Sequence, residues 1–260
     1  MLKITHDSGF FSCCSVKLYE IIKYFNKKQK LPDLIDCSKQ FSLYKPTNTD
    51  ITYEYFLKND KNIVYNSFVD FHWIYQFNDF KTIKYNILNP FIIKYFMPTN
   101  EIITIIKKIE YKYSLDYSNI CVLFYRGNDK KTEMKLCSYQ DIIDKAHIVY
   151  QNNQNIKFLI QSDETEFINT MLDTPFINNN SICFHDEIRH INKMISSVDI
   201  INKNKDNINF IFSKKYLAIT IIMSKCKYIV CGSGNCSLWI MLYRGNSHNV
   251  IQYLEGEWIT

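Results

Sequence analysis

Runs of apolar residues alternate with amphipathic segments along the second half of the chain. Continuous apolar runs of strand length occur at 119–125, 156–161, 181–185, 227–232 and 249–254. Between them apolar residues recur at helical spacing, in segments 138–152, 163–172, 215–226 and 236–245. Strands that alternate with helices are typical of βαβ units, so this half is predicted to form a mainly parallel sheet covered by helices.

The ends of two of these helices carry their own signals. Ser138 is suited to cap the helix over 138–152, and Asp141 favours its first turn. Gly245 is suited to the left-handed position that ends the helix over 236–245. Arg244 suits the negative end of that helix.

The first half is less regular. Its patterns predict strands over 2–7 and 31–37 and helices over 12–28 and 99–113. Residues 50–97 are rich in Phe and Tyr, which we interpret as buried core rather than as a surface for an acceptor substrate. We expect an N-terminal α/β lobe over 1–114 and a C-terminal one over 115–260, with a long shared interface.

Composition narrows the class of protein. The chain has 260 residues, of which 47% are apolar and 22% charged, and this indicates a globular protein. A net charge of +5, spread along the chain, is too weak for a dedicated nucleic-acid binder, so no nucleic-acid partner is predicted. No signal peptide and no apolar run of transmembrane length is visible, which favours a cytoplasmic protein, as in bacteria or large viruses.

The nine cysteines indicate reduced thiols, because their number is odd and no export signal precedes them. Cys226, Cys231 and Cys236 are five residues apart, which leaves a metal site open. Structural zinc prefers ligands two to four residues apart, so buried apolar thiols are the better interpretation. The six histidines show neither triad nor metal spacing.

In parallel α/β sheets, ligands bind at the carboxyl ends of the strands. Four polar segments follow predicted strands: 7–9, 126–133, 162–164 and 232–237. The last reads Gly-Ser-Gly-Asn-Cys-Ser and opens a helix, whose free N–H groups favour phosphate. The alternative for this segment is a simple glycine turn in which Asn235 or a serine caps the helix.

The segment after 119–125 carries charged groups. Arg126 is suited to hold a diphosphate through its forked guanidinium, or else pairs with Asp129 at the surface. Glu133, in the same loop as Lys130, is a candidate general base toward an acceptor hydroxyl, or else a solvated carboxylate.

These strand ends resemble motifs of a known enzyme superfamily, the fucosyltransferases. "FYRGNDKKTE" (124–133) resembles the His-x-Arg-Arg-x-Asp-Lys…Thr-Glu motif of α1,6-fucosyltransferases and the related motif of α1,2- and protein O-fucosyltransferases. "FLIQSDETEF" (158–167) is similar to their next strand and helix. "MSKCKYIVCGSGNCSLWIMLYRGNSHNVIQY" (223–253) is similar to the α1,2-type signature, and "GFFSCCSVKLYEI" (9–21) more loosely resembles their N-terminal turn and helix.

The resemblance implies roles for particular residues. Arg126 matches the arginine that holds the donor diphosphate, and Lys130 and Glu133 match groups near the reacting hydroxyl, with one residue deleted before Thr132. The turn of Ser233, Gly234, Asn235 and Cys236 matches the diphosphate cradle, with Ser237 as the helix cap. Gly9, Ser12 and Asp163 complete the implied donor site, Asp163 toward the ribose or base.

Three positions depart from the family pattern. Phe124 replaces its histidine, Gly127 its second arginine, and Ile219 an acid that reads guanine. An apolar side chain accepts no hydrogen bond from guanine, so both GDP and UDP are kept as donor nucleotides.

The resemblance implies a GT-B-like α/β fold of two Rossmann-like lobes with mainly parallel sheets. It also implies an inverting glycosyltransferase that moves a fucose-like or other sugar from a nucleotide-sugar donor to a hydroxyl of a glycan or protein, without metal or other cofactor. The rival is a catalytically degenerate nucleotide-binding scaffold of the same fold. A third interpretation is a different α/β enzyme that binds phosphate at 232–237.

Overall fold

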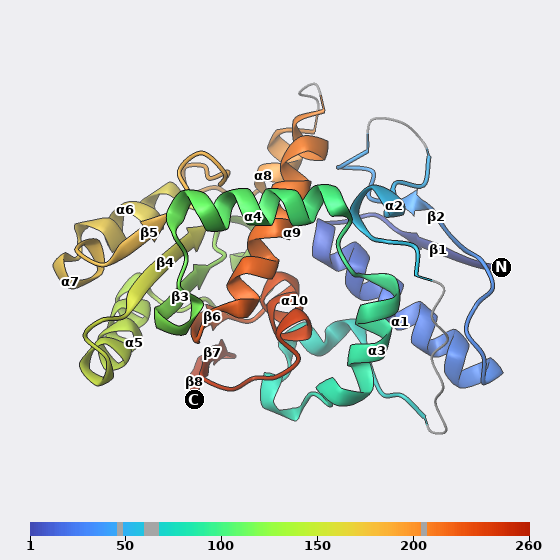
Figure 1. The fold of residues 1–260 in the computed structure, drawn as a ribbon, viewed down its shortest axis with the longest axis horizontal. Helices are drawn as coiled ribbons and strands as arrows, with labels where there is room; N and C mark the ends of the chain where they lie inside the picture. The colour runs from blue at the N-terminus through green and yellow to red at the C-terminus, as the bar shows by residue number, and fades with distance from the viewer. Residues whose placement is uncertain (46–48, 60–67, 204–206) are drawn as a thin grey trace.

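A six-stranded sheet forms the centre of the second half of the protein (Figure 1). This computed structural model describes residues 1–45, 49–59, 68–203 and 207–260. The strand order is β5-β4-β3-β6-β7-β8; neighbours from β5 to β7 run parallel, and β8 runs antiparallel to β7. The strands are β3 (Ile120–Tyr125), β4 (Lys157–Ser162), β5 (Ser181–Cys183), β6 (Tyr228–Gly232), β7 (Val250–Leu254) and β8 (Glu257–Ile259).

Helices cover both faces of this sheet, as the alternation of strands and helices predicted. Along β3, Ile120, Val122 and Phe124 enter one core, whereas Cys121 and Leu123 enter the other. The first core includes α4 (Asn100–Tyr113), α9 (Ile208–Lys225) and α10 (Asn235–Arg244), and the second lies under α5 (Tyr139–Asn152), α6 (Thr165–Asp173) and α7 (Pro175–Asn178). Both faces of β3 are therefore buried, which explains its continuous apolar sequence.

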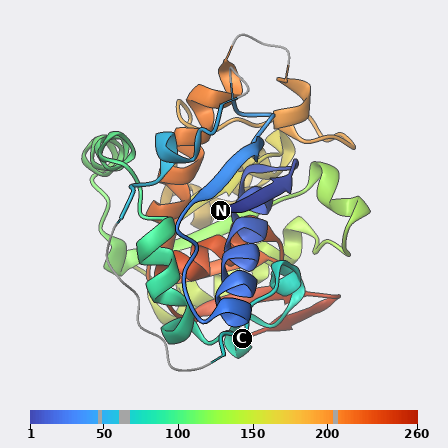
Figure 2. The same cartoon turned by 90° about the vertical axis from the view of Figure 1, so that its right-hand side faces the viewer.

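A separate two-stranded parallel sheet lies in the N-terminal half (Figure 2). It joins β1 (Leu2–His6) to β2 (Ile35–Gln40), and α1 (Phe10–Lys28) connects them. The predicted strand over 31–37 is thus misplaced, because β2 begins only at Ile35. Pro32, which has no N–H for a strand ladder, lies ahead of it.

The aromatic range 50–97 supplies much of the first core. Tyr55, Phe56, Phe80, Phe91 and Phe96 are at most 1% exposed, so the interpretation as buried core is confirmed for them. Residues 60–67 of this range lie outside the described residues. The range also contains α2 (Thr52–Tyr55), η1 (Trp73–Phe77), η2 (Phe80–Thr82) and α3 (Tyr85–Tyr95).

The fold class is therefore α/β with mainly parallel sheets, as predicted. Ser138 caps α5 in a reciprocal capping box with Asp141, and Gly245 ends α10 in the left-handed conformation, as predicted. None of the helices in the described parts of the chain has the length and apolar character needed to cross a membrane.

Candidate functional site

The order of the strands places two polar turns next to each other. β3 lies between β4 and β6. The chain continues from β3 to β4 and β5 on one side, and from β6 to β7 on the other side, so the strand order reverses next to β3. A parallel sheet opens a crevice at the carboxyl ends of its strands at such a switch point. Arg126 follows β3 directly, and the turn 232–237 follows β6, so both lie at this crevice.

A cleft of about 780 Å³ occupies this end of the sheet. All the residues that the sequence predicted for the site line it, except Asp163: Gly9, Ser12, Arg126, Lys130, Glu133, Ser233, Gly234, Asn235, Cys236 and Ser237. The wall opposite the sheet comes from the first turn of α1 and from η1. Segments more than 200 residues apart in the sequence therefore meet around one space.

Arg126 is held by three partners. Its Nε donates to Asp163 Oδ2 at 3.1 Å, one terminal nitrogen donates to the Tyr216 hydroxyl at 3.2 Å, and the other donates to Asp129 Oδ1 at 3.2 Å. Burial opposes its charge, but Asp163, followed by Tyr216 and Asp129, raises the pKa of Arg126 well above its ordinary value. The pairing with Asp129 that the sequence left open is present, and Arg126 also lines the cleft.

The turn after β6 provides backbone donors at the start of α10. The N–H groups of Ser233 and Gly234 are already used, because they donate to the carbonyls of Tyr253 and Gln76 at 3.0 Å each. Within the described part of the chain, the N–H groups of Asn235, Cys236 and Ser237 have no backbone acceptor, as expected for the first turn of a helix. Three such N–H groups at the N-terminus of a helix can donate to an anion.

The prediction that Ser237 caps α10 is wrong. The N-cap residue is Gly234, at φ 139°, and the Ser237 hydroxyl instead donates back to the Gly232 carbonyl at 2.6 Å. A glycine is needed there because this backbone angle is strained for other residues. Asn235 does not cap the helix either; its side-chain oxygen accepts from the Ser15 hydroxyl at 2.7 Å.

Lys130 and Glu133 lie together at the mouth of the cleft. They belong to a short 3₁₀ turn, η4 (Asn128–Thr132), and its C-cap. Lys130 Nζ donates to Glu133 Oε2 at 2.5 Å, and the Glu133 side chain is 41% exposed. A carboxylate that is accessible and fixed by a lysine can approach a hydroxyl group in the cleft.

The first turn of α1 forms the opposite wall. Gly9 is the N-cap residue of α1, and the Ser12 hydroxyl lies 2.9 Å from His6 Nε2. Burial lowers the pKa of His6 below its ordinary value, with Asp7 opposing this effect. His6 is therefore favoured in its neutral form beside Ser12.

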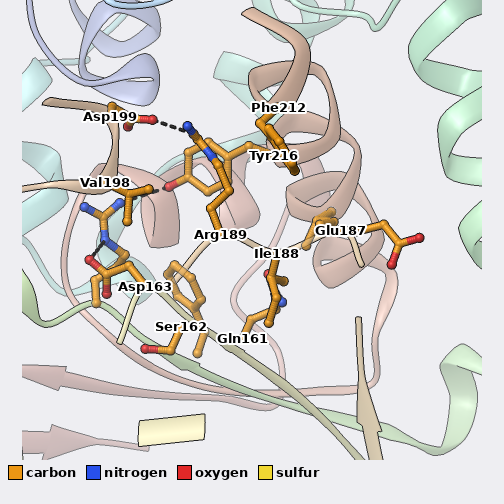
Figure 3. A pocket seen from close by; sticks show the side chains of 13 residues that line it. Gln161, Ser162, Asp163, Glu187, Ile188, Arg189, Val198, Asp199, Phe212 and Tyr216 are labelled. Atoms are coloured by element: carbon orange, nitrogen blue, oxygen red, sulfur yellow. Dashed lines mark hydrogen bonds and ion pairs between the residues drawn. The ribbon is translucent and has the colours of Figure 1, made fainter. Parts of the chain in front are cut away.

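Asp163 belongs to a smaller neighbouring pocket, of about 60 Å³, that shares Arg126 and Tyr216 with the cleft (Figure 3). Its two carboxylate oxygens accept from Arg126 Nε and from the Gly127 N–H. Ile219 and Phe124 also line this pocket, so two of the family departures meet there. In Figure 3, Arg189 points toward Asp199 across the pocket.

Gly127, where the resembled motif has a second arginine, leaves no room for a side chain. A Cβ placed on Gly127 would lie 2.1 Å from the carboxyl carbon of Glu164, which is only 1% exposed. Glu164 is fixed there by the Asn128 N–H at 2.7 Å and the Tyr139 hydroxyl at 2.6 Å. The Glu164 carboxylate thus occupies the space that a side chain at residue 127 would need.

Sequence reasoning gave no role to Tyr216 and Asp199, which line the site, or to Glu164, which lies beside Gly127. Glu164 follows a predicted strand but received no role, and its burial beside a glycine has no sequence signal. Tyr216 lies inside α9 and Asp199 inside α8 (Val198–Ile201), away from any strand end. Both line the cleft and the smaller pocket.

The described residues contain no group of three or more His, Cys, Asp or Glu side chains that could hold a metal ion. All nine cysteines are free and buried, including Cys226, Cys231 and Cys236. Burial raises the pKa of the thiols of Cys226 and Cys231 to about 12 in each case. The interpretation of these three as buried thiols is confirmed.

Comparisons with known proteins give a distant likeness in fold. No protein-family model and no curated protein matches the chain. Two solved structures of NodZ alpha-1,6-fucosyltransferase, one co-crystallized with GDP and one soaked with GDP-fucose, are similar, with TM-scores of 0.43 and 0.40 and identities of 8% and 7%. The matches cover 66% and 68% of this chain and 50% and 53% of those chains, so this chain spans about half their length. The likeness is to a fucosyltransferase-like fold at most.

Proposed function

We propose that the protein is an inverting glycosyltransferase that acts without a metal ion. It transfers a sugar, fucose-like or other, from a nucleotide-sugar donor to a hydroxyl group of a glycan or protein. The single observation that supports this most is the convergence of Arg126, the Lys130–Glu133 pair and the first turn of α10 on one cleft. The sequence resemblance assigns the same residues to the donor diphosphate and the reacting hydroxyl.

In the proposed reaction, the diphosphate of the donor lies between Arg126 and the N–H groups of Asn235, Cys236 and Ser237. The acceptor oxygen attacks the anomeric carbon, and its proton passes to Glu133. The bond from the anomeric carbon to the phosphate oxygen breaks, and the nucleoside diphosphate leaves with the electron pair. Fixed donors at that oxygen stabilise the developing charge, which is a large contribution to catalysis.

One observation bears on how Arg126 binds a diphosphate, in the transferase and in the rival nucleotide-binding scaffold alike. Arg126 is paired with two carboxylates, those of Asp163 and Asp129, so its charge is already balanced in this structure. A diphosphate must therefore displace one of these contacts or use the remaining N–H groups. The Asp129 contact is the more exposed of the two and is the one that we expect to open.

Calorimetry against GDP, UDP, GDP-fucose and a set of UDP-sugars separates the three interpretations. The transferase binds a nucleotide and slowly hydrolyses the matching sugar nucleotide. A scaffold binds without turnover, and an unrelated phosphate-binding enzyme binds neither nucleotide.

Two substitutions test the assigned roles once a donor is known. Arg126→Ala is expected to lower kcat by about 10²–10³-fold, as for removal of one donor to a developing oxyanion. Glu133→Gln is expected to lower kcat by about 10²–10⁴-fold with little change in donor Kd, because it removes only the base.

The tetrapeptide Tyr-Arg-Gly-Asn occurs twice in the sequence, at 125–128 and at 243–246. The matched control for Arg126→Ala is therefore Arg244→Ala, in the second copy. Arg244 binds the carbonyls of Ser224, Lys227 and His248 far from the cleft, so this variant should lose stability and keep its turnover. Near-normal turnover in a folded Arg126→Ala variant would overturn the assignment.

A further inference from the structure

The cleft has an aromatic wall to which the proposed reaction gives no role. Trp73 and Phe77, both from η1, line the cleft on the side opposite the sheet. Trp73 is 40% exposed and Phe77 is half-buried, unlike the aromatic residues of the same range that form the first core. Two ring systems on one turn therefore face the space in which the substrates meet.

η1 is held in place on two sides. The N–H of Gly234, in the turn after β6, donates to the Gln76 carbonyl at 3.0 Å. On the other side, the Tyr19 ring of α1 packs edge-on against His72, the N-cap residue of η1, with the ring centres 4.6 Å apart. Trp73 is therefore presented by a fixed element, and a fixed ring loses little conformational freedom when it binds a ligand.

Apolar and charged side chains share this cleft. Besides the two aromatic residues, Leu43 and Ile200 line it, and neither of them is buried. The charged residues in the lining include Asp7, Lys130, Glu133 and Lys203. A pyranose ring has C–H groups on its faces and hydroxyl groups around its rim, so it can stack on an aromatic ring and hydrogen-bond to charged groups at the same time.

The proposed donor occupies the other side of the cleft. Its diphosphate lies against Arg126 and the first turn of α10, at the carboxyl ends of the strands. In an inverting displacement, the acceptor oxygen attacks the anomeric carbon from the side opposite the leaving phosphate. The acceptor therefore approaches from the wall that carries Trp73 and Phe77.

We propose that the acceptor is a saccharide and that Trp73 stacks on the apolar face of one of its rings. The inference rests on the proposed function for the role of this ring, which is to present the reacting hydroxyl. A protein acceptor would present a Ser or Thr side chain, which has no flat apolar face to cover an indole. A saccharide uses both the ring face of Trp73 and the charged groups of the lining.

The indole N–H signals in the NMR spectrum of an isotope-labelled sample test the inference. The three tryptophans give three such signals, and Trp73→Phe identifies the signal of Trp73 by its loss. Trp239 and Trp258 do not line the cleft, so their signals are internal references. Cellobiose, lactose and maltose are titrated separately, with sorbitol as a polyol that has hydroxyl groups but no ring face. At least one disaccharide should shift the Trp73 signal more than sorbitol does and leave the references unmoved.

Substitutions measure the contribution of the indole. Trp73→Ala should weaken binding of that disaccharide in calorimetry by about tenfold or more, as for loss of an aromatic anchor. Trp73→Phe keeps a ring face and should weaken it by about threefold or less. The matched control is Ile74→Ala, in the same turn, because Ile74 is 43% exposed but outside the cleft. This control should bind like the wild type, and all three variants should keep the wild-type Tm because they change exposed side chains.

Three results would overturn the inference. No disaccharide shifts the Trp73 signal more than sorbitol does, or Trp73→Ala binds the disaccharide as the wild type does. In the third, the peptide acetyl-Gly-Ser-Thr-Gly-amide shifts the signal and no disaccharide does, which assigns the wall to a protein acceptor.

The binding measurements need neither a donor nor turnover, so they separate this inference from the proposed function. A protein that binds a disaccharide through Trp73 but transfers no sugar contradicts the proposed function alone. Sugar transfer that Trp73→Ala leaves unchanged contradicts the inference alone.

Discussion

Gly127 illustrates how a buried neighbour decides what one position can hold. The Glu164 carboxylate occupies the space of a side chain at residue 127, and it cannot move freely because the Asn128 N–H and the Tyr139 hydroxyl hold it. If the carboxylate moves away, both donors lose their hydrogen-bond acceptor. An arginine at residue 127 is therefore not accommodated by a single substitution.

Gly127→Ala is accordingly expected to destabilise the protein by about 1–3 kcal/mol, the usual range for an overpacked core. Urea unfolding monitored by circular dichroism measures this change. Gly232→Ala is the matched control, because a Cβ at Gly232 meets nothing within 4 Å. Equal stability of the two variants would show that Glu164 moves aside at no cost.

At the scale of elements, a hydrogen-bonded chain ties α1 to α10. Trp239 Nε1 donates to the Ser15 hydroxyl at 3.0 Å, and this hydroxyl donates to Asn235 Oδ1 at 2.7 Å. Both Ser15 and Trp239 are buried. The link holds the first turn of α10, with its free N–H groups, against the N-terminal wall of the cleft.

Ser15→Ala should therefore cost about 1–3 kcal/mol, because it leaves buried polar groups on both sides without a partner. A double-mutant cycle of Ser15→Ala with Asn235→Ala, measured by urea unfolding, should give a coupling energy of about 0.5–3 kcal/mol, as for residues in one hydrogen-bond network. Strictly additive effects would mean that the two helices are held by packing alone.

Local signals made many of the elements predictable. The strand over 119–125 and the capped helix over 138–152 were found because apolar runs and a Ser–Asp capping pair act over a few residues. The three-residue strand β8 is too short for a pattern, and α3 contains Pro90, which hides its helical spacing. Ser237 was misread because a serine at the third helical position can also bond backward to a carbonyl.

The candidate site was predictable where its residues directly follow a strand. Arg126 and the turn 232–237 were found because topology alone brings the carboxyl ends of parallel strands together. Asp199 and Tyr216 reach the cleft from helices, and no local pattern specifies which helical residue will face it.

At the scale of the whole molecule, two cores separated by the sheet contain all but one of the nine cysteines. The exception is Cys37, which is buried beside Thr52. Cys226 and Cys231 belong to the first core, on the side of α4 and α9. The thiols therefore act as small apolar groups, and their ionisation is coupled to unfolding of the whole molecule.

This coupling predicts a loss of stability in alkali. Burial raises the pKa of Cys226 and of Cys231 from 9.0 to about 12 in the folded state, so above pH 9 the unfolded chain has lost protons that the folded one keeps. The contribution of each thiol to stability is complete below pH 9 and is lost as the pH rises toward 12, by about 1.4 kcal/mol per pH unit.

Urea unfolding at pH 8, 9, 10 and 11 measures the slope of the unfolding free energy against pH. Cys231→Ala should flatten it by about that amount, although the variant starts from a lower stability at pH 8 because it leaves a small cavity. An unchanged slope in Cys231→Ala would show that this thiol ionises in the folded protein at its ordinary pKa.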